Sequence, residues 1–405
     1  MLVFTSVAVF LFSAIALVVA SGFSLGAGML VLGSMALLAR RPAPFGLERQ
    51  DGFLIAVLAI YFAVSIASNL IHAAPTREYD APLRFLLAIP ALLLLLAYPP
   101  RPTAFWSGLA LGGIGAGLFS TWQFFVGGEM RPGGTTNPIQ YGNISMVLGV
   151  LCLCGLSWAQ RQPHRSFWTC ILGAGMLAGL AGSLLTGSRG SWLGLPVCLI
   201  IFLMHHAGTA SRRLLRGGVI AFCVALAMLW MVPQSGLKAR TQLAVTEAGD
   251  YMAHGNADSS VGARLEMWRA GVAMLPGHWL LGWGKQGMLD GKAELVRQGA
   301  AAPSIEEHTH LHNEYLDALV KHGLPGLLAV LALYLAPLRL FARHLRHPDN
   351  AVRDYALAGT LLVVSYLAFG LTQAFLTHNN GVMIFAFMTV ILWANLRTRM
   401  RLAVA

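Results

Sequence analysis

The sequence predicts an all-α polytopic membrane protein with about twelve transmembrane helices and one large loop outside the membrane. Of its 405 residues, 56% are hydrophobic and only 11% are charged, and the mean hydropathy is +0.64. Soluble globular chains carry about 25% charged residues. Because a helix needs about 20 residues to cross the hydrocarbon core, a chain of this length holds roughly a dozen spans and one sizeable loop.

Twelve apolar runs, separated by polar links, mark the expected spans. The first run lacks a basic leader and an A-x-A-like cleavage site, so we interpret it as a span and not as a removed signal peptide. The runs cover residues 3–20, 22–39, 52–71, 82–98, 104–126, 141–159, 167–187, 191–207, 215–232, 323–341, 355–376 and 380–396.

The links between the runs form two alternating sets, which predict the orientation of the chain. The set that ends with the C-terminal tail holds 16 of the 28 lysines and arginines. Short cytoplasmic loops are enriched in these residues, whereas long loops carry little weight. We therefore expect both termini to be cytoplasmic. The same placement of basic residues explains the net charge of +11 without a nucleic-acid partner.

The runs divide the chain into three expected parts. Residues 1–232 hold spans one to nine, residues 233–322 form a helical loop subdomain on the outer side, and residues 323–405 hold spans ten to twelve with a short tail. In the loop, Ser259 and Ser260 favour the start of a helix that stops at Pro276. This helix places Arg264 and Trp268 on one face.

A second loop helix is predicted after Ser304, where the sequence SIEE has the form of a capping box. On such a helix His308, His312 and Tyr315 share one side, and His310 points elsewhere. The piece between the two helices, residues 277–287, is expected to lie at the membrane surface.

Two further external links carry candidate site residues. Arg189 lies in the short link TGSRGS between two spans, where an arginine is costly and therefore a functional candidate, unless it only marks the interface. The segment GGEMRPGGTTNPIQYGN places Gln140 at the mouth of the sixth span. A turn followed by a helix cap at Asn137 is the simpler interpretation of that segment.

These motifs, in this order, resemble the bacterial O-antigen ligase family, which shares a superfamily with O-antigen polymerases and protein O-oligosaccharyltransferases. The matching stretches are Ser188–Trp192 (SRGSW), Arg264 with Trp268 (RxxxW), Gly282–Gly284 (GWG) and His312–Leu316 (HNEYL). The topology of spans with one large loop before the last three covers most of the chain.

The resemblance implies an inner-membrane glycosyltransferase whose site lies at the periplasmic face. Its donor is a glycan on a polyprenyl diphosphate carrier, and the acceptor in the ligase branch is a sugar hydroxyl of lipid A–core. The family needs no nucleotide sugar, no metal and no cofactor, and it inverts the anomeric carbon. Membrane lipids surround the enzyme, and the oligomeric state is left open.

Residue types fit these roles. Arginines stabilise the charge of a departing diphosphate through forked hydrogen bonds, which points to Arg189 and Arg264. A histidine is the usual base near neutral pH, and the family motif selects His312, which a helix start and nearby arginines would keep neutral. We expect these three side chains to converge on one outward-facing cavity. Supporting contacts are expected from His308, Asn313, Tyr315, Gln140 and Trp268.

Three alternatives remain open at this point. His308 and His312 have the i, i+4 spacing of metal ligands but lack the intervening glutamate of a zincin. The histidines can also be non-catalytic groups at the interface. A lipid-linked glycan transporter is the non-enzyme alternative, although its mid-span charges and paired halves are not evident. Within the superfamily, the ten-residue tail disfavours the protein-directed branch.

Overall fold

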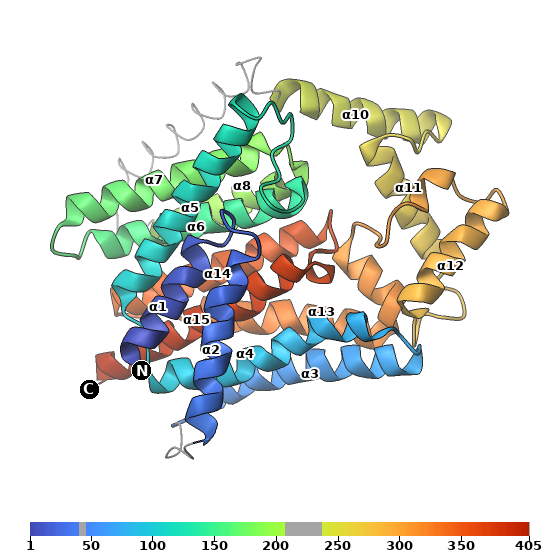
Figure 1. The fold of residues 1–405 in the computed structure, drawn as a ribbon. Helices are drawn as coiled ribbons and strands as arrows, with labels where there is room; N and C mark the ends of the chain where they lie inside the picture. Colours follow the sequence, from blue (N-terminus) through green and yellow to red (C-terminus); the bar gives the residue numbers. More distant parts are fainter. Residues whose placement is uncertain (40–45, 207–236, 405) are drawn as a thin grey trace.

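The computed structural model describes residues 1–39, 46–206 and 237–404 (Figure 1). These residues form fourteen α-helices and contain no strand, which confirms the all-α fold. The helices are α1 (Leu2–Ala14), α2 (Gly22–Ala39), α3 (Arg49–Ile71), α4 (Asp80–Ala97), α5 (Pro102–Phe125), α6 (Pro138–Ala159), α7 (Arg165–Leu185), α8 (Arg189–His206), α10 (Leu237–His254), α11 (Ser260–Ala273), α12 (Gly284–Arg297), α13 (Glu314–Ala342), α14 (Asn350–Gly370) and α15 (Asn379–Val404), with 3-10 turns η1 (Thr76–Tyr79), η3 (Pro303–Ile305) and η4 (Phe375–Thr377).

Nine helices of the described residues are long and apolar enough to cross a membrane, and they match nine of the twelve predicted spans. They are α2 to α7 and α13 to α15. The expected first span, 3–20, is a shorter helix of 13 residues, α1. The expected span 191–207 is the helix α8, which starts with a charged residue and ends with two histidines. The expected span 215–232 lies outside the described residues.

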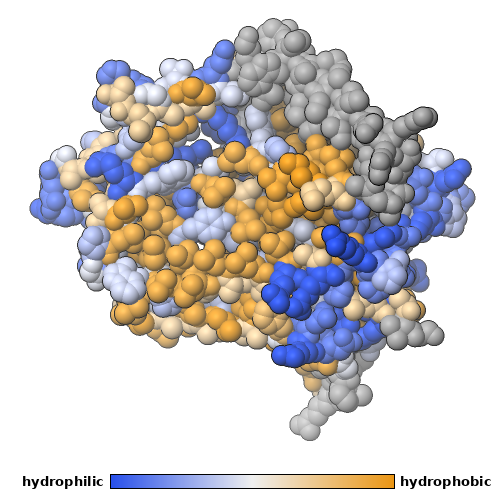
Figure 2. All heavy atoms as spheres, turned by 180° about the vertical axis from the view of Figure 1, so that it is seen from behind, coloured by the Kyte–Doolittle hydropathy of each residue, from blue (hydrophilic) through white to orange (hydrophobic). Residues whose placement is uncertain are grey.

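The helices lie in a bundle with two distinct ends. The N- and C-termini lie at one end, and α11 and α12 lie at the other (Figure 1). Seen from behind, a broad apolar band separates polar surfaces on either side (Figure 2). Large hydrophobic side chains remain exposed on the membrane helices, for example Leu118 on α5 and Leu177 on α7. This surface suits a lipid environment.

Small residues let the membrane helices approach closely. A Cβ atom on Gly113 of α5 would overlap the backbone of Gly175 on α7, and one on Gly117 would overlap Ala178. In lipid, where burial of apolar surface gives little driving force, such close backbone contact is the main source of helix association.

Helix α13 is broken at Gly323, where it meets the loop between α11 and α12. Gly323 has φ 66° and ψ −164°. The interruption frees two backbone groups of α13 for other partners. The carbonyl of Val320 accepts from the N–H of Trp283 at 2.8 Å, and the N–H of Leu324 donates to the carbonyl of Trp279 at 2.8 Å. A Cβ on Gly323 would overlap the carbonyl of Leu280. The first turns of α13, from Glu314, therefore belong to the loop region, and its apolar part starts where the span was predicted.

A buried ion pair joins α3 to α15 near the end of the bundle that carries the termini. Asp51 and Arg397 are 0% and 1% exposed. The Arg397 Nε donates to Asp51 Oδ1 at 2.9 Å, and Trp393 Nε1 donates to the same oxygen at 2.8 Å. Glu48, just before α3, also pairs with Arg397. Two helices that lie far apart in the sequence are thus joined through one arginine and two carboxylates.

Asp51→Asn is expected to destabilise the folded protein by about 1–3 kcal/mol, because Arg397 would lose its buried counter-charge and keep only Glu48, which is half exposed. The midpoint of thermal unfolding in detergent should fall, and it should not fall for Asp290→Asn, whose side chain is exposed on α12. The double variant Asp51→Asn with Arg397→Met should recover part of the loss. An unchanged midpoint for Asp51→Asn alone would contradict the assignment.

Candidate functional site

The candidate site is built around the backbone of Leu311, just before α13. Its N–H donates to Asp317 Oδ1 of α13 at 2.9 Å. Its carbonyl accepts from Trp268 Nε1 of α11 at 3.0 Å. Asp317 is itself buried and paired with Lys321 at 2.7 Å. Both polar groups of one buried residue are therefore fixed by two different helices, which sets the position of the next residue, His312.

His312 has an unusual backbone and a buried ring. Its φ is +50°, in the left-handed region that is uncommon for a residue other than glycine. The side chain is 8% exposed, and its Nδ1 has no hydrogen-bond partner among the described residues. A strained, buried histidine with an unsatisfied nitrogen is the kind of residue that is retained for function.

The prediction that a helix opens at Ser304 and contains His308 and His312 is wrong. Pro303–Ile305 is a 3-10 turn, residues 306–313 are irregular, and the helix begins only at Glu314. The reason is Lys292 of α12, a buried side chain whose ammonium donates to the carbonyls of Ile305, at 3.0 Å, and His308. These carbonyls bind a cation from a neighbouring helix, and the capping box does not form.

The irregular backbone gathers four imidazole rings into a row. The His308 and His312 ring centroids are 5.2 Å apart, those of His312 and His310 4.3 Å, and those of His310 and His378 5.1 Å. The expectation that His310 points elsewhere, which assumed a helix, is therefore wrong. His378, at the end of η4, joins the row from a distant part of the sequence. No motif or spacing in the sequence connects His378 with the other three histidines.

Burial lowers the pKa of every ring in this row. The pKa of His312 falls to about 2, mainly because of desolvation and then because of His310 and Arg264. Desolvation and His378 lower the pKa of His310 to about 3, and desolvation and Lys321 lower that of His378 to about 4. Gln373 opposes the shift at His312. All of these rings are neutral at pH 7 and can accept a proton.

Three arginines lie near one another, and the charge of one of them, Arg264, acts on His312. Desolvation, followed by the charges of Arg189 and Arg131, lowers the pKa of Arg264. Desolvation and the charge of Arg189 likewise lower the pKa of Arg131. The three come from separate elements: Arg131 from the α5–α6 loop, Arg189 from the first residue of α8, and Arg264 from α11. We call them the arginine cluster.

The arginine cluster carries more positive charge than the neighbouring carboxylate of Glu247 neutralises. Glu247 of α10 pairs with Arg189 at 3.3 Å and also accepts from the N–H of Val261 at 3.2 Å. Within the part of the chain that the structure describes, the guanidinium of Arg264 has no hydrogen-bond or ion-pair partner. A half-buried cluster of this charge is suited to an anion with several oxygens.

Arg131 is a member that sequence reasoning missed. It lies in the segment GGEMRPGGTTNPIQYGN, from which only the polar residues at the span mouth were chosen. Like Arg189, Arg131 is an arginine in a predicted external link between two spans, so the argument that made Arg189 a functional candidate applies to it as well. Its Nε approaches the carbonyl of Thr186, 3.4 Å away, next to the link that carries Arg189.

The other candidate residues position the backbone. Asn313 caps α13, because its Oδ1 accepts from the N–H groups of Tyr315 and Leu316 at 3.1 and 3.0 Å. The hydroxyl of Tyr315 donates to the carbonyl of Leu367 at 2.8 Å. Ser259 caps α11 as predicted, with its hydroxyl accepting from Gly262 N at 3.0 Å.

Gln140 lies in a separate hydrogen-bonded group. Its Oε1 accepts from Thr136 Oγ1 at 2.7 Å and from Asn380 Nδ2 at 2.9 Å, which links the start of α6 to the start of α15. Asn137 is the N-cap of α6, as the simpler interpretation held. Gln140 also lines a cavity of about 150 Å³ whose wall includes His378.

Arg264 thus connects the other two predicted site residues, because its charge interacts with both Arg189 and His312. None of the three lines the cavity beside Gln140 or the cavity beside His378. A cavity of about 310 Å³ lies on the His378 side of the row. In the described residues, no group of three or more His, Cys, Asp or Glu side chains is placed to hold a metal ion.

Comparison with known proteins bears on this arrangement. A protein of Haemophilus influenzae, which carries only the name "Uncharacterized protein", is 27% identical over 333 residues, or 82% of this chain and 83% of its own length. A sequence model described as O-antigen ligase matches residues 174–331, a range that includes all four motifs. The family that the motifs resemble is therefore also the family whose model matches residues 174–331 of this chain.

Proposed function

We propose that this protein is an O-antigen ligase of the bacterial inner membrane. It transfers a glycan from a polyprenyl diphosphate carrier to a sugar hydroxyl of lipid A–core, without a metal ion and with inversion. The observation that carries the proposal is the arginine cluster beside the neutral His312, at the end of the bundle away from the termini. With the termini in the cytoplasm, residues 233–322 form a periplasmic subdomain over the site.

The arginine cluster fits the leaving group. When the glycan departs, the bond between the anomeric carbon and a diphosphate oxygen breaks, and that oxygen takes the electron pair. Arg264, Arg189 and Arg131 stabilise this charge from three directions in a partly desolvated site. Glu247 forms an ion pair with Arg189. When the donor binds, its phosphate oxygens replace the Glu247 carboxylate on Arg189.

His312 fits the role of general base. The acceptor oxygen forms its bond to the anomeric carbon while its proton passes to an imidazole nitrogen of His312. In the empty site this ring is a weak base, because burial and the charge of Arg264 keep its pKa low. A diphosphate bound to the arginines adds negative charge beside the ring and so raises its pKa. Donor binding therefore makes His312 a stronger base.

The first test is transfer in vitro with EDTA present, using purified protein, polyprenyl diphosphate glycan and lipid A–core. Wild type is expected to attach the glycan to the lipid acceptor, and His312→Ala to lose at least about 100-fold in rate, the usual contribution of a general base. Glycan that grows on the carrier would identify a polymerase instead. Carrier that crosses a bilayer without any product would identify a transporter.

Arg264→Lys is expected to lower kcat about 100-fold, because it keeps the charge but loses the forked donor pair directed at the diphosphate. Arg297→Lys is the matched control, since Arg297 is an exposed arginine paired with Glu294 on α12. The measurement is the transfer rate at saturating donor and acceptor. Equal rates for the two variants would remove Arg264 from the mechanism.

The pH dependence should differ between the empty and the donor-bound enzyme. The pKa of His312 is about 2 in the empty site, far below the usual value for histidine, so kcat/KM for the donor should stay level from about pH 8 to about pH 5. The bound diphosphate raises this pKa, so kcat should begin to fall at a higher pH than kcat/KM. Both profiles falling together near pH 6.5 would show a histidine that neither burial nor the arginines perturb.

A further inference from the structure

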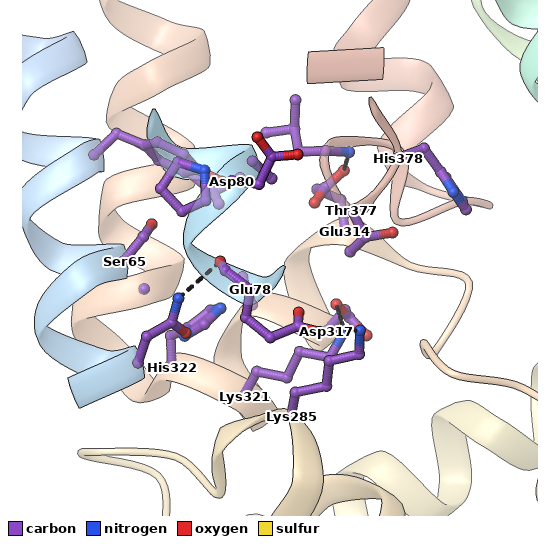
Figure 3. Close-up of a pocket in the computed structure, with 18 of the residues that line it drawn as sticks. Ser65, Glu78, Asp80, Lys285, Glu314, Asp317, Lys321, His322, Thr377 and His378 are labelled. Carbon is purple, nitrogen blue, oxygen red and sulfur yellow. Dashed lines mark hydrogen bonds and ion pairs between the residues drawn. The ribbon is translucent and has the colours of Figure 1, made fainter. Parts of the chain in front are cut away.

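A cavity between α3, η1, α4, α12, α13 and the η4 loop is not used by the proposed chemistry. It encloses about 310 Å³. Glu78, Lys285, Asp317 and Lys321 form one part of its wall, and Glu314, Thr377 and His378 form another (Figure 3). This volume is within the range of small-ligand pockets.

Each cation in the wall of this cavity has a carboxylate partner, unlike those of the arginine cluster. Four cationic and four acidic side chains line it. Lys285 pairs with Glu78 at 2.7 Å, Lys321 pairs with Asp317 at 2.7 Å, and Arg84 pairs with Asp80. An anion would have to compete with these carboxylates for every cation, so the cavity is poorly suited to a second phosphate.

An uncharged polyhydroxy compound fits such a wall. A hydroxyl both donates and accepts hydrogen bonds, so it can join an existing ion pair without unbalancing the charge. Each lysine ammonium has three protons, and its paired carboxylate uses one of them. The hydroxyl of Ser65 and the amide of Asn69 also lie in the wall. The Asn69 amide nitrogen donates to the carbonyl of Glu78 at 2.9 Å, which leaves the Asn69 carbonyl to accept.

The histidine row connects this cavity with the arginine cluster. Arg264 acts on the pKa of His312 and of His308, at one end of the row. At the other end, the charges that act on His378 are Lys321, Asp317 and Lys285, which all line the cavity. His310 lies between the two ends. A ligand in the cavity is thus two imidazole rings away from His312.

We propose that this cavity binds a neutral sugar of the acceptor's core oligosaccharide, behind the sugar that receives the glycan. The inference rests on the proposed ligase function for the identity of the ligand. The acceptor chain reaches from the cavity along the histidine row and presents its terminal hydroxyl to His312. The donor diphosphate occupies the arginine cluster, so the two substrates approach the row from opposite ends.

Lys285→Met tests the proposal, with Arg297→Met as the matched control at the other end of the same helix, α12. Lys285→Met should raise KM for lipid A–core at least about tenfold, the effect of losing one hydrogen bond to a charged group. It should leave kcat and KM for the donor within about twofold. Ser65→Ala, a smaller change in the same wall, should raise the acceptor KM in the same direction. Unchanged acceptor KM in both variants, or a raised donor KM, would overturn the proposal.

A binding measurement separates this inference from the proposed function, because it needs no turnover. Deacylated core oligosaccharide should bind wild type in nanodiscs without donor, and Lys285→Met should weaken that binding about tenfold. If the oligosaccharide binds in this way but no transfer occurs, the ligase proposal fails and the sugar site stands. Displacement of the oligosaccharide by inorganic pyrophosphate would indicate an anion site. Displacement by phosphatidylethanolamine in the nanodisc would indicate a lipid headgroup site. Either result would overturn the proposal.

Discussion

The two hydrogen bonds on the backbone of Leu311 determine the arrangement of the whole candidate site. One comes from α11 and the other from the first turns of α13, so they join two helices of the loop region at a single buried residue. Arg264 lies one turn before Trp268 on α11, and His312 follows Leu311 directly. The bond that fixes Leu311 therefore also sets Arg264 beside His312. A left-handed backbone at His312 persists because its neighbours on both sides are held: Leu311 by these bonds and Asn313 as the cap of α13.

Lys292 and Glu314 support the same region from two further sides. The ammonium of Lys292 binds carbonyls of the segment before Leu311, and Glu314 Oε2 accepts from the N–H of Leu376 at 2.8 Å, which holds the η4 loop that carries His378. Each bond joins an irregular backbone segment to a helix. Irregular backbone near a membrane is tolerated where its polar groups are satisfied by the protein. Lys292 and Glu314 therefore stabilise the two irregular segments that carry the histidine row.

The sequence predicted the bundle better than the site. Hydropathy over runs of about 20 residues is a local property, and nine described helices follow it. The cap at Ser259 was also predictable, because an N-cap acts within three residues. The segment around His308 was not, since its conformation depends on Lys292, which belongs to a separate helix. Helix α12 itself is polar and short, and only its first residues drew attention, as a surface piece. His378 and Arg131 joined the site through tertiary contacts that no local pattern encodes.

The placement of two binding regions at opposite ends of the histidine row gives the proposed reaction an order. With the arginine cluster empty, His312 lies beside an unneutralised Arg264 and holds a proton poorly. An acceptor that binds first therefore meets a weak base and does not react. The donor both supplies the electrophile and neutralises the arginines, so the base strengthens only when there is a glycan to transfer. Water would meet the same strengthened base, but it lacks the contacts in the cavity that hold a sugar hydroxyl in place. Selection of the acceptor over water therefore depends on positioning, and the wall around Lys285 and Glu78 is where that positioning originates.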